Sequence, residues 1–165
     1  MQKGLLGMMA ATIVAIVTIA LVTGVVTFGQ SKFMKAGGRL EGSWDVRVSL
    51  RNCQTGDVIR SFDSVTQFMS GGTVIDSTSG VPQALKTPGE GIWEHTVDSN
   101  YRFKFKSFTF DASGNYTGYT IIQHEAILDD SADNYESAGT AEIYAPNGIL
   151  VATGCSSTTA TRIVF

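Results

Sequence analysis

The sequence predicts an all-β domain, an eight-stranded antiparallel up-and-down barrel, preceded by one N-terminal hydrophobic helix. From Leu40 onward, apolar and polar residues alternate with a period of two, and no stretch sustains the period of an amphipathic helix. Glycine, asparagine, aspartate and proline interrupt these alternating runs at short intervals. Cys53 and Cys155 stand near the ends of the first and last runs, so a disulfide between them would join the two edges of the sheet and favour a closed barrel.

The N-terminal segment differs from the rest of the chain, because residues 4–30 carry no charged side chain. As a secretory signal, this segment has small residues at Thr27 and Gly29 that suit cleavage before Gln30. As a helix, the same run is long enough to cross a hydrocarbon core of about 30 Å. Both outcomes stay open at this point.

We therefore expect three regions: a signal peptide or membrane anchor at 1–29, a linker at 30–39 and a β-barrel domain at 40–165. Either fate of the first region exports the domain to the periplasm or the extracellular space, where a disulfide persists. If the anchor is kept, residues 4–29 tether the protein to the membrane, and this segment is the only expected membrane contact.

Charge argues against a nucleic acid partner. The chain has 12 basic and 15 acidic side chains, a net charge of −3, and its basic residues form no dense cluster. Oligomeric state cannot be derived from these features. The sequence also shows no nucleophile motif, no phosphate-binding glycine loop and no cofactor motif, and its two histidines are too few for a typical metal site. We therefore expect no metal and no cofactor.

Turn residues divide the barrel domain into eight expected strands. Gly71-Gly72, Ala112-Ser113-Gly114 and Pro146-Asn147-Gly148 suit tight turns with left-handed glycines. One connection, 79–90, is long and contains two of the three prolines, so it is either a lid or a plain surface loop. The expected strands are 42–53, 59–70, 73–78, 91–97, 100–110, 115–128, 134–145 and 149–164.

Placing Cys53 opposite Cys155 predicts how the first and last strands pair. In that register Trp44 lies opposite Val164, and Arg162, opposite Val46, comes near the indole of Trp44. Trp44, Val46, Val48 and Leu50 then face the interior. Because Ile143, Ala141 and Val151 favour the interior in the opposite parity, we also expect a β-bulge in the last strand near Gly154.

Aromatic residues on the fourth and fifth strands predict one wall of the barrel lumen. Trp93 and His95 alternate inward on one strand, and Tyr101, Phe103 and Phe105 do so on the next. These rings either fill a small barrel completely or line a ligand pocket.

Small residues on the seventh and eighth strands would leave volume opposite this wall on whichever face is internal. The alternative is a flat outer face that pairs with another barrel. The small residues are Ser137, Gly139, Ala141, Ser157, Thr159 and Ala160.

Strand 115–128 leaves one choice of face open, since adjacent residues His124 and Glu125 cannot both point inward. The apolar parity changes between Phe105 and Phe108, which predicts a bulge near Lys106-Ser107 and favours His124 in the lumen. The candidate ligand-binding residues are therefore Trp93, His95, Tyr101, Phe103, Phe105 and His124.

Several of these residues resemble the calycin superfamily of lipocalins and their relatives. Gly42-Ser43-Trp44 is similar to the lipocalin G-x-W motif, and Arg162 stands where lipocalins place an arginine against that tryptophan. The segments 52–56, 87–93 and 147–162 resemble secreted bacterial lipocalin-like proteins of unassigned activity. The resemblance implies a calycin-like barrel and an exported location.

Together these features predict an exported or membrane-tethered barrel that binds a small, largely apolar molecule in its lumen. The alternatives are a barrel enzyme of cyclase or isomerase type, using His95, His124 or Glu125, and a structural or assembly module that acts through its outer surface.

Overall fold

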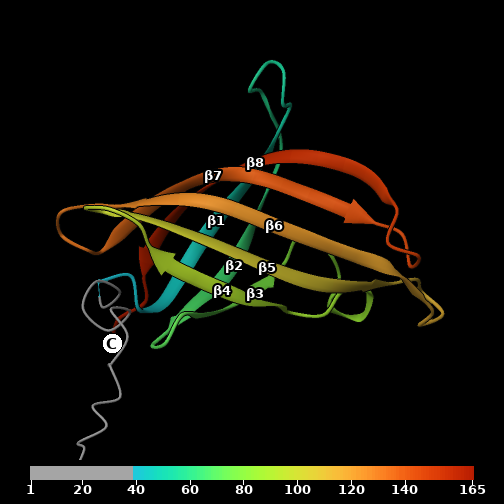
Figure 1. Ribbon diagram of the computed structural model, residues 1–165, viewed down its shortest axis with the longest axis horizontal. Coiled ribbons are helices and arrows are strands. Elements are labelled where there is room, and N and C mark those ends of the chain that lie inside the picture. The colour runs from blue at the N-terminus through green and yellow to red at the C-terminus, as the bar shows by residue number, and fades with distance from the viewer. Residues whose placement is uncertain (1–38) are drawn as a thin grey trace, which may run out of the picture.

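The computed structural model describes residues 39–165, which form a closed barrel of eight antiparallel strands in chain order (Figure 1). The predicted all-β barrel is confirmed, whereas the predicted signal or anchor helix lies outside the described residues. Within residues 39–165, no helix could span a membrane. The strands are β1 (Gly42–Arg51), β2 (Val58–Met69), β3 (Thr73–Thr78), β4 (Gly89–His95), β5 (Asn100–Phe110), β6 (Tyr116–Leu128), β7 (Asn134–Tyr144) and β8 (Leu150–Arg162), with a short 3-10 helix, η2 (Gln83–Leu85), before β4.

The turns follow from glycine conformations that other residues rarely adopt. Gly71 and Gly72 have φ of 90° and 91°, and Gly114 and Gly148 have φ of 81° and 82°. These left-handed positions, which carry little steric penalty in glycine, are the ones predicted for the hairpins.

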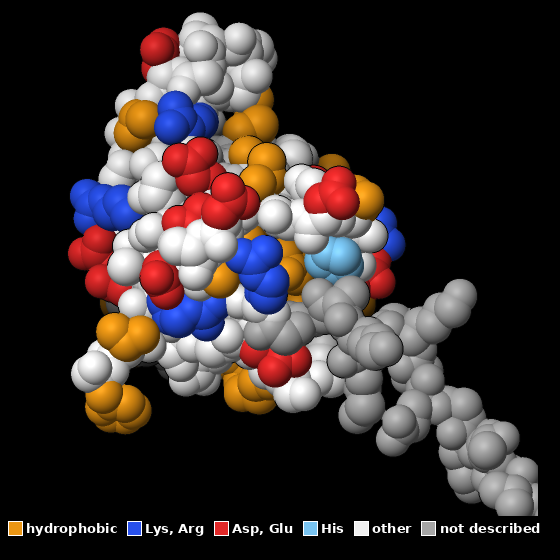
Figure 2. Space-filling view, turned by 90° about the vertical axis from the view of Figure 1, so that its left-hand side faces the viewer, with side chains coloured by type: hydrophobic (Ala, Val, Ile, Leu, Met, Phe, Trp, Pro, Cys, Tyr) orange, Lys and Arg blue, Asp and Glu red, His pale blue; other side chains and the backbone are white. Residues whose placement is uncertain are grey.

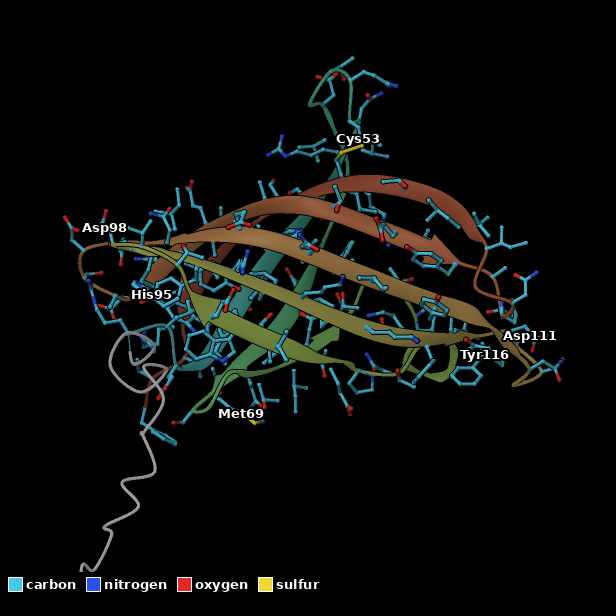
Figure 3. The ribbon with its side chains drawn as sticks, viewed as in Figure 1. Cys53, Met69, His95, Asp98, Asp111 and Tyr116 are labelled. Atoms are coloured by element: carbon cyan, nitrogen blue, oxygen red, sulfur yellow. A yellow bond between two sulfur atoms is a disulfide. The ribbon has the colours of Figure 1, made fainter. Side chains whose placement is uncertain are left out.

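The seam between β1 and β8 closes the barrel, and the predicted disulfide between Cys53 and Cys155 is confirmed, with 5.3 Å between the two Cα atoms (Figure 3). The predicted register was wrong by two residues: Trp44 lies opposite Arg162, and Arg51 lies opposite Cys155. Cys53 follows the last paired residue of β1, so the disulfide crosses the seam diagonally. Because an even shift keeps every side chain on its face, Trp44 still points inward.

Both predicted bulge positions were also wrong. The register between β7 and β8 shifts between Ile143 and Tyr144, which pair with Ala152 and Leu150. Val151 is the extra residue and is 65% exposed rather than interior, whereas Gly154 pairs regularly with Ala141. A single unpaired residue near the hairpin is enough to restore parity along the rest of β8.

In β5, pairing with β6 runs without a shift through Lys106 and Ser107, and the shift comes between Thr109 and Phe110. Ser107 is the buried residue there, and Phe108 faces outward. The Lys106 ammonium lies 5.1 Å from the centroid of the Phe108 ring, and the Tyr116 ring packs 6.1 Å from it. These contacts give Phe108 partners on the outer face, so its hydrophobicity was a misleading sign of parity.

The two ends of the barrel differ. At one end, Leu40 and Trp44 are fully buried, and Arg162 hydrogen-bonds both Glu41 and Ala132 of the β6–β7 turn. Figure 2, which faces the left-hand side of Figure 1, shows acidic and basic side chains interspersed over this closed end. The β1–β2, β3–β4, β5–β6 and β7–β8 connections surround the other, open end (Figure 1).

Residues 79–88 run along the open end and are held by specific bonds. Arg60 donates from Nη2 to the Gly80 carbonyl oxygen at 2.5 Å. The Thr87 amide donates to the Phe108 carbonyl at 3.0 Å, and the Phe108 amide donates back to the Thr87 hydroxyl at 3.0 Å. The segment is therefore fixed at both ends, and its side chains are positioned relative to the lumen.

Candidate ligand-binding cavity

A cavity of about 240 Å³ occupies the half of the lumen toward the open end. Its walls come mainly from apolar side chains of β1, β5, β6 and β7, which the alternation of each strand directs inward. The protein's own side chains leave this volume empty, so the lumen can admit a small molecule. The apolar lining includes Val46, Val48, Phe103, Phe105, Ile122 and Ala141.

Packed aromatic rings close the other half of the lumen. Phe68 is the centre of this packing, with its ring centroid 5.7 Å from Trp93, 5.4 Å from Phe103 and 5.9 Å from Tyr135. The Trp93 indole also donates to the Met69 carbonyl at 2.9 Å. The rings pack edge to face, and the Met69 carbonyl satisfies the indole N–H. This half of the lumen is therefore a packed core and not a pocket.

The six predicted ligand-binding residues therefore lie in three different places. Phe103, Phe105 and His124 line the cavity. Trp93 and Tyr101 belong to the packed half, with their ring centroids 6.0 Å apart. The sixth, His95, lies at the closed end, where its Nε2 is 2.7 Å from the Asp98 carbonyl oxygen and its ring packs on Tyr101 (Figure 3).

His124 is held in the lumen by two serines. It pairs with Phe103 on β5, and its Nδ1 and Nε2 lie 2.8 Å from the Ser137 and Ser156 hydroxyl oxygens. Glu125, the next residue, faces solvent. Burial lowers the pKa of His124 from 6.5 to about 4, so the ring is neutral near pH 7. One ring nitrogen then donates to a serine and the other accepts, and no carboxylate of residues 39–165 forms an ion pair with the imidazole.

Gly139 makes room for this imidazole. A Cβ atom at Gly139 would lie 2.6 Å from His124 Cδ2 and 2.0 Å from the Gln123 carbonyl oxygen. This part of the β7 wall therefore needs a residue without a side chain. Ala141, Ser156 and Thr158 continue this wall along β7 and β8 with small side chains, while Ser157 and Thr159 lie in the opposite parity on the outside.

Asp76 is a cavity residue that the sequence analysis missed. It is 7% exposed, and its Oδ2 accepts hydrogen bonds from Ser64 Oγ at 2.6 Å and Thr66 Oγ1 at 2.9 Å. Burial raises the pKa of this carboxyl, and the two hydroxyl bonds partly offset the effect. A signal was present, because alternation along 73–78 places Asp76 on the same face as the apolar Val74.

Lys86 reaches the same cavity from the loop before β4. Burial lowers the pKa of its ammonium, while the nearby Asp76 charge acts in the opposite direction. Arg60 also lines the cavity, at its exposed mouth, with its guanidinium carbon 5.1 Å from the centroid of the Phe62 ring. The cavity is thus apolar along its length, with one carboxyl and two cationic groups placed around it.

A second hollow, of about 440 Å³, lies on the outer face over β1, β2, β7 and β8. Exposed charged side chains line it, and an ion pair between Arg47 and Asp63, 2.6 Å long, crosses its floor. Its groups already have water and each other as partners, so it lacks the desolvated polar atoms of the lumen. We therefore treat the lumenal cavity as the candidate site.

Comparison with known proteins gives no match: no family model, no curated protein and no solved structure is detectably similar to this chain.

Proposed function

We propose that this protein is an exported, calycin-like barrel that binds a small, largely apolar molecule in its lumen. The observation that carries the proposal is the apolar cavity of about 240 Å³ inside the closed barrel. An apolar cavity of this kind favours apolar ligands, because removing their apolar surface from water contributes about 25 cal/mol per Å² to binding.

The two walls of the cavity support this proposal. Phe103 and Phe105 have parallel rings with centroids 6.2 Å apart, which present a flat apolar surface. Ala141 lines the cavity from β7 with a small side chain, and Gly139, two residues away, leaves room for the His124 ring. A binding site for apolar molecules needs this contrast between large and small residues, since uniform side chains would fill the lumen.

The disulfide supports the exported location, because bonds of this kind persist in oxidising compartments outside the cytoplasm. The uncharged N-terminal segment supports the same location through its match to an export signal or anchor.

Two measurements test the proposal. Native mass spectrometry of protein purified from the exported fraction should show a small molecule that solvent extraction removes. Naphthalene, an apolar probe without a head group, should then bind the extracted barrel, detected through its fluorescence.

A pair of variants locates the binding. Ala141→Phe places a ring inside the cavity and should weaken naphthalene binding at least about tenfold, the effect of roughly 1.4 kcal/mol. Thr140→Phe adds the same ring to the outer face of β7 and should leave binding unchanged. The proposal fails if neither a natural molecule nor naphthalene binds, or if both variants bind naphthalene as the wild type does.

A further inference from the structure

We propose that the ligand is a neutral amphiphile whose hydroxyl group hydrogen-bonds Asp76 Oδ1 inside the cavity and faces Lys86. This inference rests on the proposed function and specifies the chemical class of ligand. It starts from one free atom: both side-chain hydrogen bonds to the Asp76 carboxyl go to Oδ2.

Among residues 39–165, no side-chain or backbone donor forms a hydrogen bond with Asp76 Oδ1. Asp76 lines the cavity, so this oxygen is available to a bound molecule. This oxygen is not among the fully buried, unpartnered side-chain atoms of residues 39–165, so it keeps accessible surface at which a ligand O–H group can donate to it.

Lys86 adds the complementary group. Its ammonium also lines the cavity, and within the described part of the chain it forms no ion pair, which places it more than 4.0 Å from the Asp76 oxygens. Asp76 and Lys86 line the same cavity, and Asp76 pairs with Gly89, three residues after Lys86, so the two groups face one another across a gap. A hydroxyl in this gap can donate to Asp76 and accept from Lys86 at the same time.

The charges around the cavity disfavour an ionised head group. An ammonium head would add a third cation to Lys86 and Arg60, with Asp76 as the only carboxylate that lines the cavity among residues 39–165. A carboxylate head that reached the same depth would meet the Asp76 carboxyl, and two like charges at short range repel strongly where water is scarce. A neutral hydroxyl avoids both costs.

The experiment compares two isomeric probes, nonanol and methyl octyl ether, by isothermal titration calorimetry with the extracted protein. Both have the same atoms and nearly the same apolar surface, and both offer an acceptor to Lys86, but only nonanol has a donor for Asp76. Nonanol should bind at least about tenfold more tightly than the ether. Nonylamine and nonanoate complete the series and should bind more weakly than nonanol.

Two variants assign the preference to Asp76. Asp76→Ala should reduce the ratio of nonanol to ether affinity to near one, while Glu90→Ala, which removes an exposed carboxylate on β4, should keep the wild-type ratio. Because the ratio is measured first in the wild type, the test does not depend on whether Asp76→Ala folds.

Equal binding of nonanol and the ether to wild-type protein would overturn the inference, as would tighter binding of the amine or the carboxylate. If naphthalene binds but the nine-carbon probes do not discriminate, the binding function stands and the hydroxyl preference is wrong. If neither naphthalene nor any of the nine-carbon probes binds, both proposals fail.

Discussion

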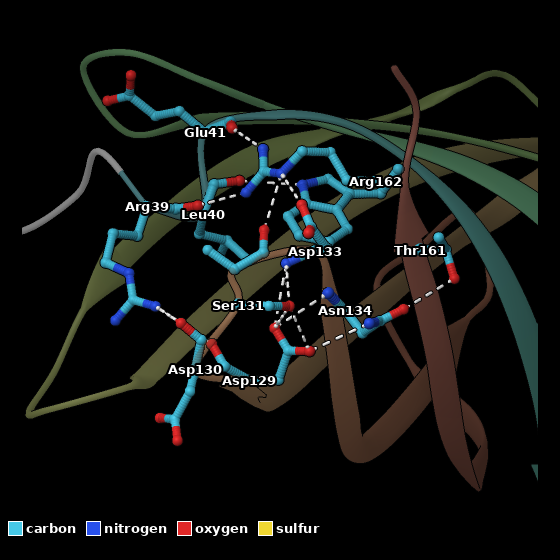
Figure 4. Close-up of polar contacts among 12 residues, drawn as sticks. Arg39, Leu40, Glu41, Asp129, Asp130, Ser131, Asp133, Asn134, Thr161 and Arg162 are labelled. Atoms are coloured by element: carbon cyan, nitrogen blue, oxygen red, sulfur yellow. Dashed lines mark hydrogen bonds and ion pairs between the residues drawn. The ribbon is translucent and has the colours of Figure 1, made fainter. Parts of the chain in front are cut away.

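The guanidinium of Arg162 lies over the indole of Trp44, with its central carbon 4.2 Å from the ring centroid. From this position it donates to three backbone carbonyl oxygens, those of Arg39, Glu41 and Ala132, at 2.5, 2.6 and 2.8 Å (Figure 4). One side chain thus joins the chain entering β1, the end of β8 and the β6–β7 turn. The closed end of the barrel depends on this contact.

Replacing Arg162 by methionine should destabilise the barrel by about 2–4 kcal/mol. The variant keeps an apolar stem over Trp44 but removes the cation–π contact and leaves three carbonyls without their donor. Arg102→Met is the matched control, because Arg102 pairs with Glu94 on the exposed outer face, where such pairs contribute about 0–1 kcal/mol. Urea unfolding followed by tryptophan fluorescence measures both, and equal losses in the two variants would contradict the role given to Arg162.

The disulfide should contribute several kcal/mol through the unfolded state. Cys53 and Cys155 are 102 residues apart. In the chain-entropy model, closing a loop of about this length restricts the unfolded chain and raises its free energy by up to about 4.7 kcal/mol. The double variant Cys53→Ser/Cys155→Ser should lose roughly 2–5 kcal/mol while β1 and β8 stay paired. A loss below about 1 kcal/mol in chemical denaturation would show that the seam does not need the bond.

The alternation of apolar and polar residues predicted the barrel because the side-chain period of a strand is a local property. Each strand shows its buried face in its own residues, and the turn glycines mark where strands end. The same parity placed Trp44 and Phe103 inside, and it survived a register error of two residues because a two-residue shift keeps the faces.

The register of the strands and the positions of the bulges were harder to predict from the sequence, since they depend on contacts between strands. The position of a disulfide fixes pairing only to within the reach of two side chains, which is why Cys53 could lie beyond β1. Phe108 and Val151 are apolar residues on the outer face, so their hydrophobicity indicated the wrong parity. His124 was placed inward from a bulge that does not exist, although direct pairing with Phe103 gives the same orientation.

The polar part of the cavity was missed for a related reason. Asp76 is a single polar residue in a short strand, so it was not predicted as a site residue. Lys86 lies in a loop with no periodic pattern. Their proximity follows from the pairing of Asp76 with Gly89, just three residues beyond Lys86. Only the three-dimensional arrangement shows that both line one cavity.

His124 should make the protein less stable as the pH falls. Its pKa is lowered to about 4 in the folded protein against 6.5 in the unfolded chain, so protons favour the unfolded state. The stability present above pH 6.5 should decline by up to roughly 3 kcal/mol as the pH falls to about 4. His124→Gln should flatten the dependence of the unfolding free energy on pH in this window, and an unchanged slope would contradict it.

Asp76 should have the opposite effect on the pH dependence of stability and make the protein less stable as the pH rises. Its pKa is raised in the folded protein, so its contribution is fully present below the unfolded value of 3.8 and is lost as the pH rises through the folded pKa. Asp76→Asn cannot ionise, yet its carbonyl oxygen can still accept from Ser64 and Thr66. Its stability relative to wild type should therefore increase as the pH rises from 3 to 7.

Asp111→Asn is a control for Asp76→Asn, because its stability relative to wild type should change with pH in the opposite direction. Hydrogen bonds from Asn115 lower the pKa of the exposed Asp111 carboxyl, so this contribution is present above pH 3.8 and lost as the pH falls below it. Relative to wild type, Asp111→Asn should therefore become less stable as the pH rises, where Asp76→Asn becomes more stable. Thermal unfolding at pH 3 and pH 7 separates the two trends, and parallel trends would show that the Asp76 carboxyl is not desolvated by the cavity.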